Sequence, residues 1–276
     1  MHFVFQRFWH TSVRLDQDEL LVDTTYSSTD KEICARMKVY PDSLLVRQAW
    51  LEIYRAPGVD SPRAEEISGL EGMEAYFDSG EALRKALMPA SVPEAKDLFA
   101  EAVRGVIQAE TFLVEQRGYA NPLEYQDYWS EIYQGACRFY SNMDRVQTRW
   151  YDHIGYYNRT GSLFNRMKSQ TMSLNNNVIM LAGHLHDSFH SVAVEMELDR
   201  AEGLVKRARG DILRAPDSVC MESTVYMDKL IGTSLADLAK KEIAFLLGGE
   251  NGCVHLIDLV SDGAKTISLY RESENT

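Results

Sequence analysis

The fold is decided by a stretch of sequence that occurs twice. Residues 5–57 read FQRFWHTSVRLDQDELLVDTTYSSTDKEICARMKVYPDSLLVRQAWLEIYRAP, and residues 164–216 read FNRMKSQTMSLNNNVIMLAGHLHDSFHSVAVEMELDRAEGLVKRARGDILRAP. Aligned without a gap, the two stretches are identical at 11 of 53 positions, where chance would give about three. Both end in Arg-Ala-Pro. We infer that the chain contains an internal duplication.

Each copy predicts the same small antiparallel sheet. Apolar residues alternate with polar ones over 33–39 and again over 192–198, a period of two that is typical of a strand. Turn residues follow, and the next apolar stretch closes a hairpin in each copy. A third strand precedes each hairpin. The expected strands are 20–22, 33–39 and 45–54 in the first copy, and 179–181, 192–198 and 204–213 in the second.

Helices are expected after each sheet. Ser61-Pro62 is typical of a helix start in the first copy, and the second copy predicts helices over 221–230, over 235–247 and from 253 onwards. Sheets followed by helices indicate an α+β protein. We expect two tandem units, each a three-stranded antiparallel sheet with helices, joined by a helical insert. The expected parts are a first unit at 1–110, the insert at 111–159 and a second unit at 160–276.

The expected insert is rich in aromatic residues. Eleven of the 39 residues from Tyr119 to Tyr157 are aromatic, against 10% in the whole chain. Asn121-Pro122 indicates a helix start, and the aromatic side chains that follow recur at helical spacing. We expect this stripe to pack in a core or to bind a protein partner or a second copy of the chain. A stacking pocket for a planar ligand is the alternative, although no glycine-rich loop indicates a nucleotide.

Composition excludes several classes of partner. The 276 residues include 41 acidic and 29 basic side chains, and the formal charge of −12 disfavours nucleic acid and anionic membrane surfaces. No apolar run approaches the roughly 18 residues of a membrane span, and Met1 to Leu15 has no signal-peptide core. The four cysteines form no Cys-x-x-Cys pair. We therefore expect a cytoplasmic protein with free thiols.

Residue types that bind metals are concentrated in the second copy, whereas the first copy lacks every soft ligand at the matching positions. The paired positions are His184 with Thr25, His186 with Ser27, Asp187 with Ser28, His190 with Lys31 and Cys220 with Ser61, while His255 lies roughly opposite Asp97. Cys253 adds a further thiol to the second copy. Thiolate, imidazole and carboxylate groups together suit zinc or iron. The sequence therefore predicts a metal site in the second unit.

Two residues carry most of this expectation. Cys220 stands where the N-cap of a helix is expected, and a helix N-terminus lowers the pKa of a thiol below its usual value. His255 follows a glycine-rich loop that starts at Gly248. A reactive thiol at Cys220 with His255 as its base is one alternative. Inert core residues are the other, since most free cysteines are buried hydrophobes.

Residues 192–267 also resemble the iron–sulfur cluster assembly scaffolds of the IscU and NifU N-terminal type. The motifs that carry the resemblance are Glu202 to Ala208, then Cys220, then Leu230-Ile231-Gly232-Thr233-Ser234-Leu235, then His255-Leu256. The resemblance implies that Cys220 and His255 are ligands. The first scaffold cysteine falls near Ser188 and the last on Leu256, and the resemblance implies Asp187, His186 or His190 in place of the first.

The C-terminal part shows a second resemblance. The ending Gly252-Cys253-Val254-His255-Leu256 is similar to that of an uncharacterised bacterial family, a domain of unknown function. That family also has Arg-x-Pro with a cysteine four residues after the proline, as in Arg214-Ala215-Pro216 and Cys220.

The expected function is metal binding. We expect a zinc- or iron-binding, or iron–sulfur-related, accessory protein whose candidate ligands are Cys220, His255, Asp187, His186 and His190. One alternative is a thiol-dependent enzyme that acts on a small molecule through Cys220 and His255. The other is an interaction or oligomerisation module without chemistry. The sequence assigns no catalytic residue and favours a role other than catalysis.

Overall fold

The computed structural model describes residues 2–155 and 159–274. By its internal contacts the chain divides into two compact units. The N-terminal unit comprises residues 8–125 and 157–167, and the C-terminal unit comprises residues 1–7, 126–156 and 168–276. Residues 156–158, at the end of the expected insert, lie outside the described residues.

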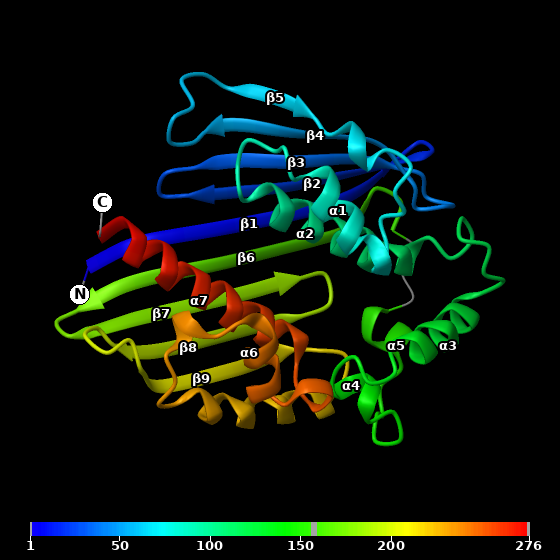
Figure 1. Ribbon diagram of the computed structural model, residues 1–276. Coiled ribbons are helices and arrows are strands. Elements are labelled where there is room, and N and C mark those ends of the chain that lie inside the picture. The colour runs from blue at the N-terminus through cyan, green and yellow to red at the C-terminus, as the bar shows by residue number, and fades with distance from the viewer. Residues whose placement is uncertain (1, 156–158, 275–276) are drawn as a thin grey trace. The chain divides into compact units, whose positions relative to one another are not determined.

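Nine strands form one sheet, so the expectation of two separate three-stranded sheets is wrong, although the α+β class is correct (Figure 1). The hydrogen-bonded order is β5-β4-β3-β2-β1-β6-β7-β8-β9. The strands are β1 (His2–Asp16), β2 (Glu19–Ser28), β3 (Glu32–Val39), β4 (Val46–Arg55), β5 (Arg63–Glu66), β6 (Ser162–Asn175), β7 (Val178–Asp187), β8 (Ser191–Asp199) and β9 (Val205–Arg214).

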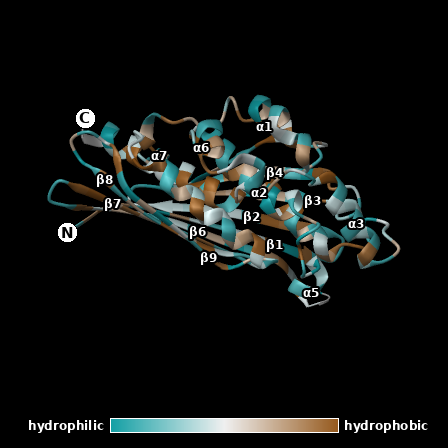
Figure 2. Cartoon of the chain, turned by 90° about the horizontal axis from the view of Figure 1, so that it is seen from below, coloured by the Kyte–Doolittle hydropathy of each residue, from teal (hydrophilic) through white to brown (hydrophobic). Residues whose placement is uncertain are grey.

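The strands that the sequence failed to predict are the long first strands of the two copies, β1 and β6. In β6 the buried positions alternate regularly, but three successive ones are Arg166, Lys168 and Gln170. Because these inward positions hold polar residues, the sequence lacks the alternation of apolar and polar residues that predicts a strand. Each has a partner within its own unit. Arg166 pairs with Glu101 at 3.2 Å and Lys168 with Asp262 at 2.9 Å, and Nε2 of Gln170 donates to the Leu259 carbonyl. Figure 2 shows hydrophobic residues (brown) and hydrophilic residues (teal) intermixed along the strands.

The three strands that each copy was expected to contain repeat in register. Leu20 pairs with Val39 across β2 and β3, and Ile179 pairs with Leu198 across β7 and β8, an offset of 159 in both strands. The bulges in β3–β4 and β8–β9 recur at the same offset. Each copy therefore builds the same antiparallel hairpin sheet from its own residues.

One strand replaces an expected helix. After Ser61-Pro62 the chain forms β5, whose Glu66 pairs with Trp50 of β4, so the helix expected there is wrong. The helices of the N-terminal unit are α1 (Gly80–Ala86), α2 (Ala95–Ala109) and the short 3-10 helices η1 (Ser68–Leu70), η2 (Phe77–Ser79) and η3 (Glu110–Phe112). Helix α2 packs on β2 and β3. A Cβ at its Gly105 would lie 2.8 Å from Cγ2 of Thr11, so the close approach of helix and sheet requires glycine there.

The C-terminal unit repeats this arrangement with a longer helix. Helix α7 packs on β7 and β8 (Figure 1), and a Cβ at its Gly263 would lie 2.6 Å from Cδ2 of Leu181. The core between helix and sheet includes Met196 of β8 and Leu259 and Val260 of α7. The helices are η4 (Ser218–Leu230), η5 (Leu235–Asp237), α6 (Lys240–Leu246), η6 (Gly249–Asn251) and α7 (Val254–Glu274). Among the described residues, no helix is both long and apolar enough to cross a membrane.

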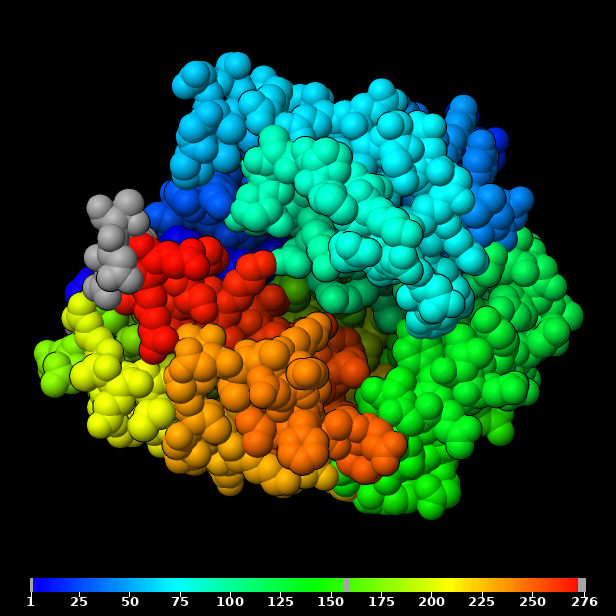
Figure 3. Space-filling view, in the orientation of Figure 1, coloured from blue at the N-terminus to red at the C-terminus, as the bar shows by residue number. Residues whose placement is uncertain are grey.

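The insert contributes three short helices, α3 (Pro122–Ile132), α4 (Arg138–Ser141) and α5 (Trp150–Ile154). Several of its aromatic side chains are buried, among them Tyr125, Trp129 and Tyr151. Arg138 holds α4 within the C-terminal unit, because its guanidinium donates to the carbonyls of Val219 and Asn251 and its main-chain N–H to that of Gly252. Figure 3 shows the insert (green) against the segment around residue 250 (orange). Binding of a partner by the insert stays a prediction.

Candidate functional site

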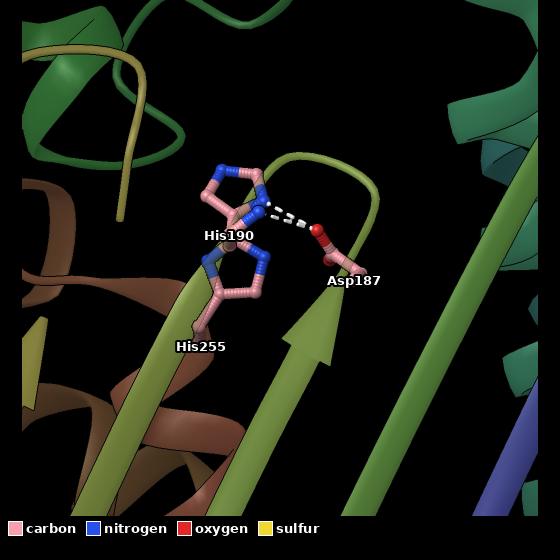
Figure 4. Close-up of side chains that lie close together, drawn as sticks. All are labelled: Asp187, His190 and His255. Atoms are coloured by element: carbon pink, nitrogen blue, oxygen red, sulfur yellow. Dashed lines mark hydrogen bonds and ion pairs between the residues drawn. The ribbon is translucent and has the colours of Figure 1, made fainter. Parts of the chain in front are cut away.

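Three of the expected metal ligands meet in the C-terminal unit. Asp187 ends β7, His190 ends the turn that leads to β8, and His255 lies in the first turn of α7 (Figure 4). One ligand atom from each residue lies within 4.8 Å of the ligand atoms of the other two. A carboxylate and two imidazoles are therefore brought together from two elements that are separated by 65 residues of chain, from 190 to 255.

The turn between β7 and β8 is built around the Asp187 carboxylate, whose side chain is fully buried. Its Oδ1 accepts hydrogen bonds from the main-chain N–H groups of Phe189 at 2.8 Å and His190 at 2.6 Å. The Nδ1 atom of His190 lies 3.1 Å from the same oxygen. Arg214 of β9 closes the turn by donating to the Asp187 carbonyl at 2.5 Å. An aspartate that accepts from main-chain groups two and three residues ahead is typical of such turns.

The position of His255 is fixed by the loop in front of α7. Gly248 has a φ of 96°, and a Cβ at Gly252 would lie 2.1 Å from the Leu247 carbonyl, so both positions require glycine. The His255 ring lies against that of His190, with centroids 4.0 Å apart and planes inclined at 36°. Its Nδ1 is 3.9 Å from Sγ of Cys253. Both imidazoles therefore present ring nitrogens to a common space.

Helix α5 of the insert contacts the turn between β7 and β8. Trp150 of α5 packs edge-on against Phe189 at 4.8 Å between ring centroids, and Nε2 of His153 lies 2.9 Å from the Phe189 carbonyl. Burial lowers the pKa of His153, so the ring is neutral at neutral pH. Neither His153 nor Trp150 was expected at the site from the sequence. The aromatic density of this segment was the available signal, but it does not indicate which residues reach the turn.

His184 and His186 do not join the site. In β7 they alternate with Gly183, Leu185 and Asp187, which are buried, while both histidines are exposed. Successive side chains of a strand point to opposite faces of the sheet. The two histidines therefore lie on the face opposite Asp187, a conclusion that the same alternation would have allowed from sequence.

Cys220 does not occupy an N-cap and is not activated. The N-cap of η4 is Asp217, whose carboxylate accepts from the Val219 N–H at 2.9 Å. Cys220 lies instead in a small apolar cluster with Phe139 and Val219. Burial raises the pKa of its thiol to about 12, so the expected lowering is wrong. The loss of hydration outweighs any attraction from the helix terminus.

The matching turn of the first copy contains no such group. Ser28 takes the place of Asp187 and accepts from the Lys31 N–H at 3.1 Å. Lys31 takes the place of His190, and its Nζ forms an ion pair with Oε1 of Glu94 at 2.6 Å. Asp97, expected opposite His255, is exposed in the first turn of α2. The same turn is thus closed by an internal cation in one copy and lined by metal-binding groups in the other.

Fold and site together define an α+β protein with a repeated hairpin sheet and one candidate metal-binding group. Residues 157–268 match the model of a family described as a protein of unknown function, DUF2889. The match includes Asp187, His190 and His255 and agrees with the expected similarity of this part to an uncharacterised family. No curated protein and no solved structure matches the chain.

The resemblance to iron–sulfur cluster scaffolds is not supported. The family match is a different one, and the three-stranded units that the resemblance implied are part of a nine-stranded sheet. Leu256, which falls where the scaffolds have their last cysteine, is a core residue with 1% of its surface exposed. Short motifs in the same order are weak evidence when each one alone is common.

Proposed function

We propose that the C-terminal unit binds a single transition-metal ion, zinc or iron, through Asp187, His190 and His255. The observation that carries the proposal is the convergence of the three donor groups within 4.8 Å. The first copy supports it as an internal comparison, because the same turn is closed there by Lys31 and Glu94 instead of by ligands.

The donor set fits the chemistry of both metals. Zinc is commonly held by imidazole nitrogens and carboxylate oxygens, and three protein ligands leave a position for water or substrate. Two histidines and one carboxylate also form the set that binds non-haem iron(II) with open positions. An ion at this site would compete with the contact between Asp187 and His190, so binding replaces one hydrogen bond with metal–ligand bonds.

The residues around the ligands support this role. Main-chain N–H groups from Phe189 and His190 hold the Asp187 carboxylate in its orientation. Packing of Trp150 on Phe189 holds the turn that carries His190. A ligand that is held in place by outer contacts loses less entropy when the ion binds.

The thiol-dependent alternative has less support. A nucleophilic cysteine must be a thiolate near neutral pH. Burial raises the pKa of Cys220 to about 12, and the thiol is surrounded by Phe139 and Val219 rather than by a base.

Elemental analysis of the untagged full chain, purified without chelators and then offered zinc or iron(II), tests the proposal. We expect about one ion per chain. His190→Ala and His255→Ala should lose it. His184→Ala and His186→Ala are matched controls on the other sheet face and should keep it. A folded wild-type protein that takes up neither metal would contradict the proposal.

A further inference from the structure

A cysteine lies beside the candidate site without being part of the three-residue group. Cys253 and His255 flank Val254 at the start of α7, and Sγ of Cys253 is 3.9 Å from Nδ1 of His255. The thiol is half-buried. In a tetrahedral zinc site, bonds of about 2.3 Å to sulfur and about 2.0 Å to nitrogen place the two donor atoms about 3.5 Å apart. The observed separation differs from this value by a few tenths of an ångström.

Hydrogen bonds hold the main chain on both sides of Cys253. The carbonyl of Gly252 accepts from the N–H of Arg138 at 2.8 Å, and that of Cys253 accepts from the N–H of Ile257 at 3.0 Å. Burial raises the pKa of the Cys253 thiol to about 11, although the N–H groups of His255 and Leu256 are within hydrogen-bonding reach of the sulfur. Rotation about the Cα–Cβ bond is the movement that changes the distance from the sulfur to the three ligands.

Cys253 packs against the core of the C-terminal unit, whereas the other thiols of this unit lie at a second apolar cluster. Cys220 is buried with Phe139 and Val219, and Cys137 packs against the same apolar cluster. Helix α2 of the first copy repeats the burial pattern of α7 at an offset of 158, which matches Cys253 with Ala95. The thiol therefore appears in the copy that has the histidines and is missing at the equivalent place in the copy that has the ion pair.

We propose that Cys253 is a fourth, thiolate ligand of the ion bound by Asp187, His190 and His255; this inference rests on the proposed function. Binding forms a metal–sulfur bond and releases the thiol proton to solvent. Three protein ligands leave a coordination position open, as catalytic zinc sites do, whereas a fourth closes the coordination sphere. A thiolate also favours zinc over harder ions such as magnesium or manganese. The site is then one that stores the ion or stabilises the fold.

Cobalt(II) absorption spectroscopy on the full chain tests the assignment, because a cobalt–thiolate bond gives a charge-transfer band in the near ultraviolet that oxygen and nitrogen ligands do not give. We expect the band in the wild type and its loss in Cys253→Ser, which should still bind cobalt through the other three ligands. Cys137→Ser and Cys220→Ser are the matched controls and should keep it.

The outcomes separate the two proposals. Cobalt bound without the band in the wild type, or a band lost in Cys220→Ser and kept in Cys253→Ser, would overturn the role of Cys253 while the metal site stands. Failure of the wild type to bind cobalt, zinc or iron would overturn both. Should Cys253→Ser not fold, X-ray absorption of the zinc-loaded wild type decides the question. One sulfur neighbour at about 2.3 Å supports the assignment, and nitrogen and oxygen neighbours alone contradict it.

Discussion

The turn after β2 and the turn after β7 have the same backbone and different chemistry. Ser28 and Asp187 each accept a hydrogen bond from the main-chain N–H three residues ahead. The residue that donates this N–H is Lys31 in one turn and His190 in the other, and the Lys31 side chain pairs with a carboxylate of its own unit. Because Ser28 accepts the equivalent hydrogen bond in the first copy, Asp187 has a structural role in its turn. Its presence alone is therefore not evidence for a ligand, and the two histidines that accompany it carry the argument.

The largest effect is expected from breaking the first turn. Lys31→Met leaves the Glu94 side chain, which is 9% exposed, without its cation. Loss of one partner from a largely buried ion pair should lower the free energy of unfolding by about 3 kcal/mol, measured by urea denaturation of the full chain. Lys31→Met combined with Glu94→Leu should recover most of the loss, because no buried charge is left. A single variant as stable as the wild type would show that the pair contributes nothing.

Added zinc should stabilise the protein through the second turn and not through the first. Zinc at about 100 times its dissociation constant should add about 2.7 kcal/mol to the free energy of unfolding, seen as a rise in Tm that chelation reverses. His255→Ala should abolish the rise. Lys31→Met should retain it, since its change lies in the first copy. Equal responses of wild type and His255→Ala to zinc would place the effect elsewhere on the chain.

Exchanging the turn residue separates the two roles of Asp187. Asp187→Ser copies the first turn, so the free energy of unfolding should change by less than about 1 kcal/mol while metal binding is lost. Asp187→Ala removes the acceptor of the Phe189 and His190 N–H groups and should cost about 1–3 kcal/mol. Calorimetric zinc titration and urea denaturation on both variants measure the two effects. Zinc affinity unchanged in Asp187→Ser would remove the carboxylate from the ligand set.

The smallest effect concerns pH and the insert. Burial lowers the pKa of His153 in the folded chain. As the pH falls below about 6.5, His153 therefore becomes protonated in the unfolded chain before it does in the folded chain. The corresponding stability is fully present above that pH and is lost below it, with a slope of at most about 1.4 kcal/mol per pH unit. His153→Gln should reduce this slope in urea denaturation at several pH values. An identical slope in both proteins would contradict the assignment.

The hairpins of both copies were predictable because Ile33 to Val39 and Val192 to Leu198 alternate on a sheet with one buried face. Strands β1 and β6 were not, because charged residues such as Arg166 face inward and are neutralised by partners far away in sequence. β5 was missed because Ser61-Pro62 is a helix signal that pairing with β4 overrides.

For the candidate site, the sequence was informative about residue types and less so about their directions. Asp187, His190 and His255 were selected by contrast with the first copy, and the structure brings them together. His186 was selected as well, although strand periodicity directs it to the other face. Cys220 depended on an N-cap that Asp217 occupies. Residue type alone could not exclude His186 or Cys220, because their positions depend on which face of a strand or helix is buried.

The ion pair of Lys31 and Glu94 also sets the two copies apart in their dependence on the surroundings. The Lys31 ammonium is covalently part of the chain, so it cannot dissociate from the protein or be removed by a chelator. An ion in the second turn obeys mass action, and its occupancy follows the free concentration of metal. One half of the repeat thus has a constant charge and the other a variable one. The first serves as the built-in reference against which the loading of the second can be measured in the same molecule.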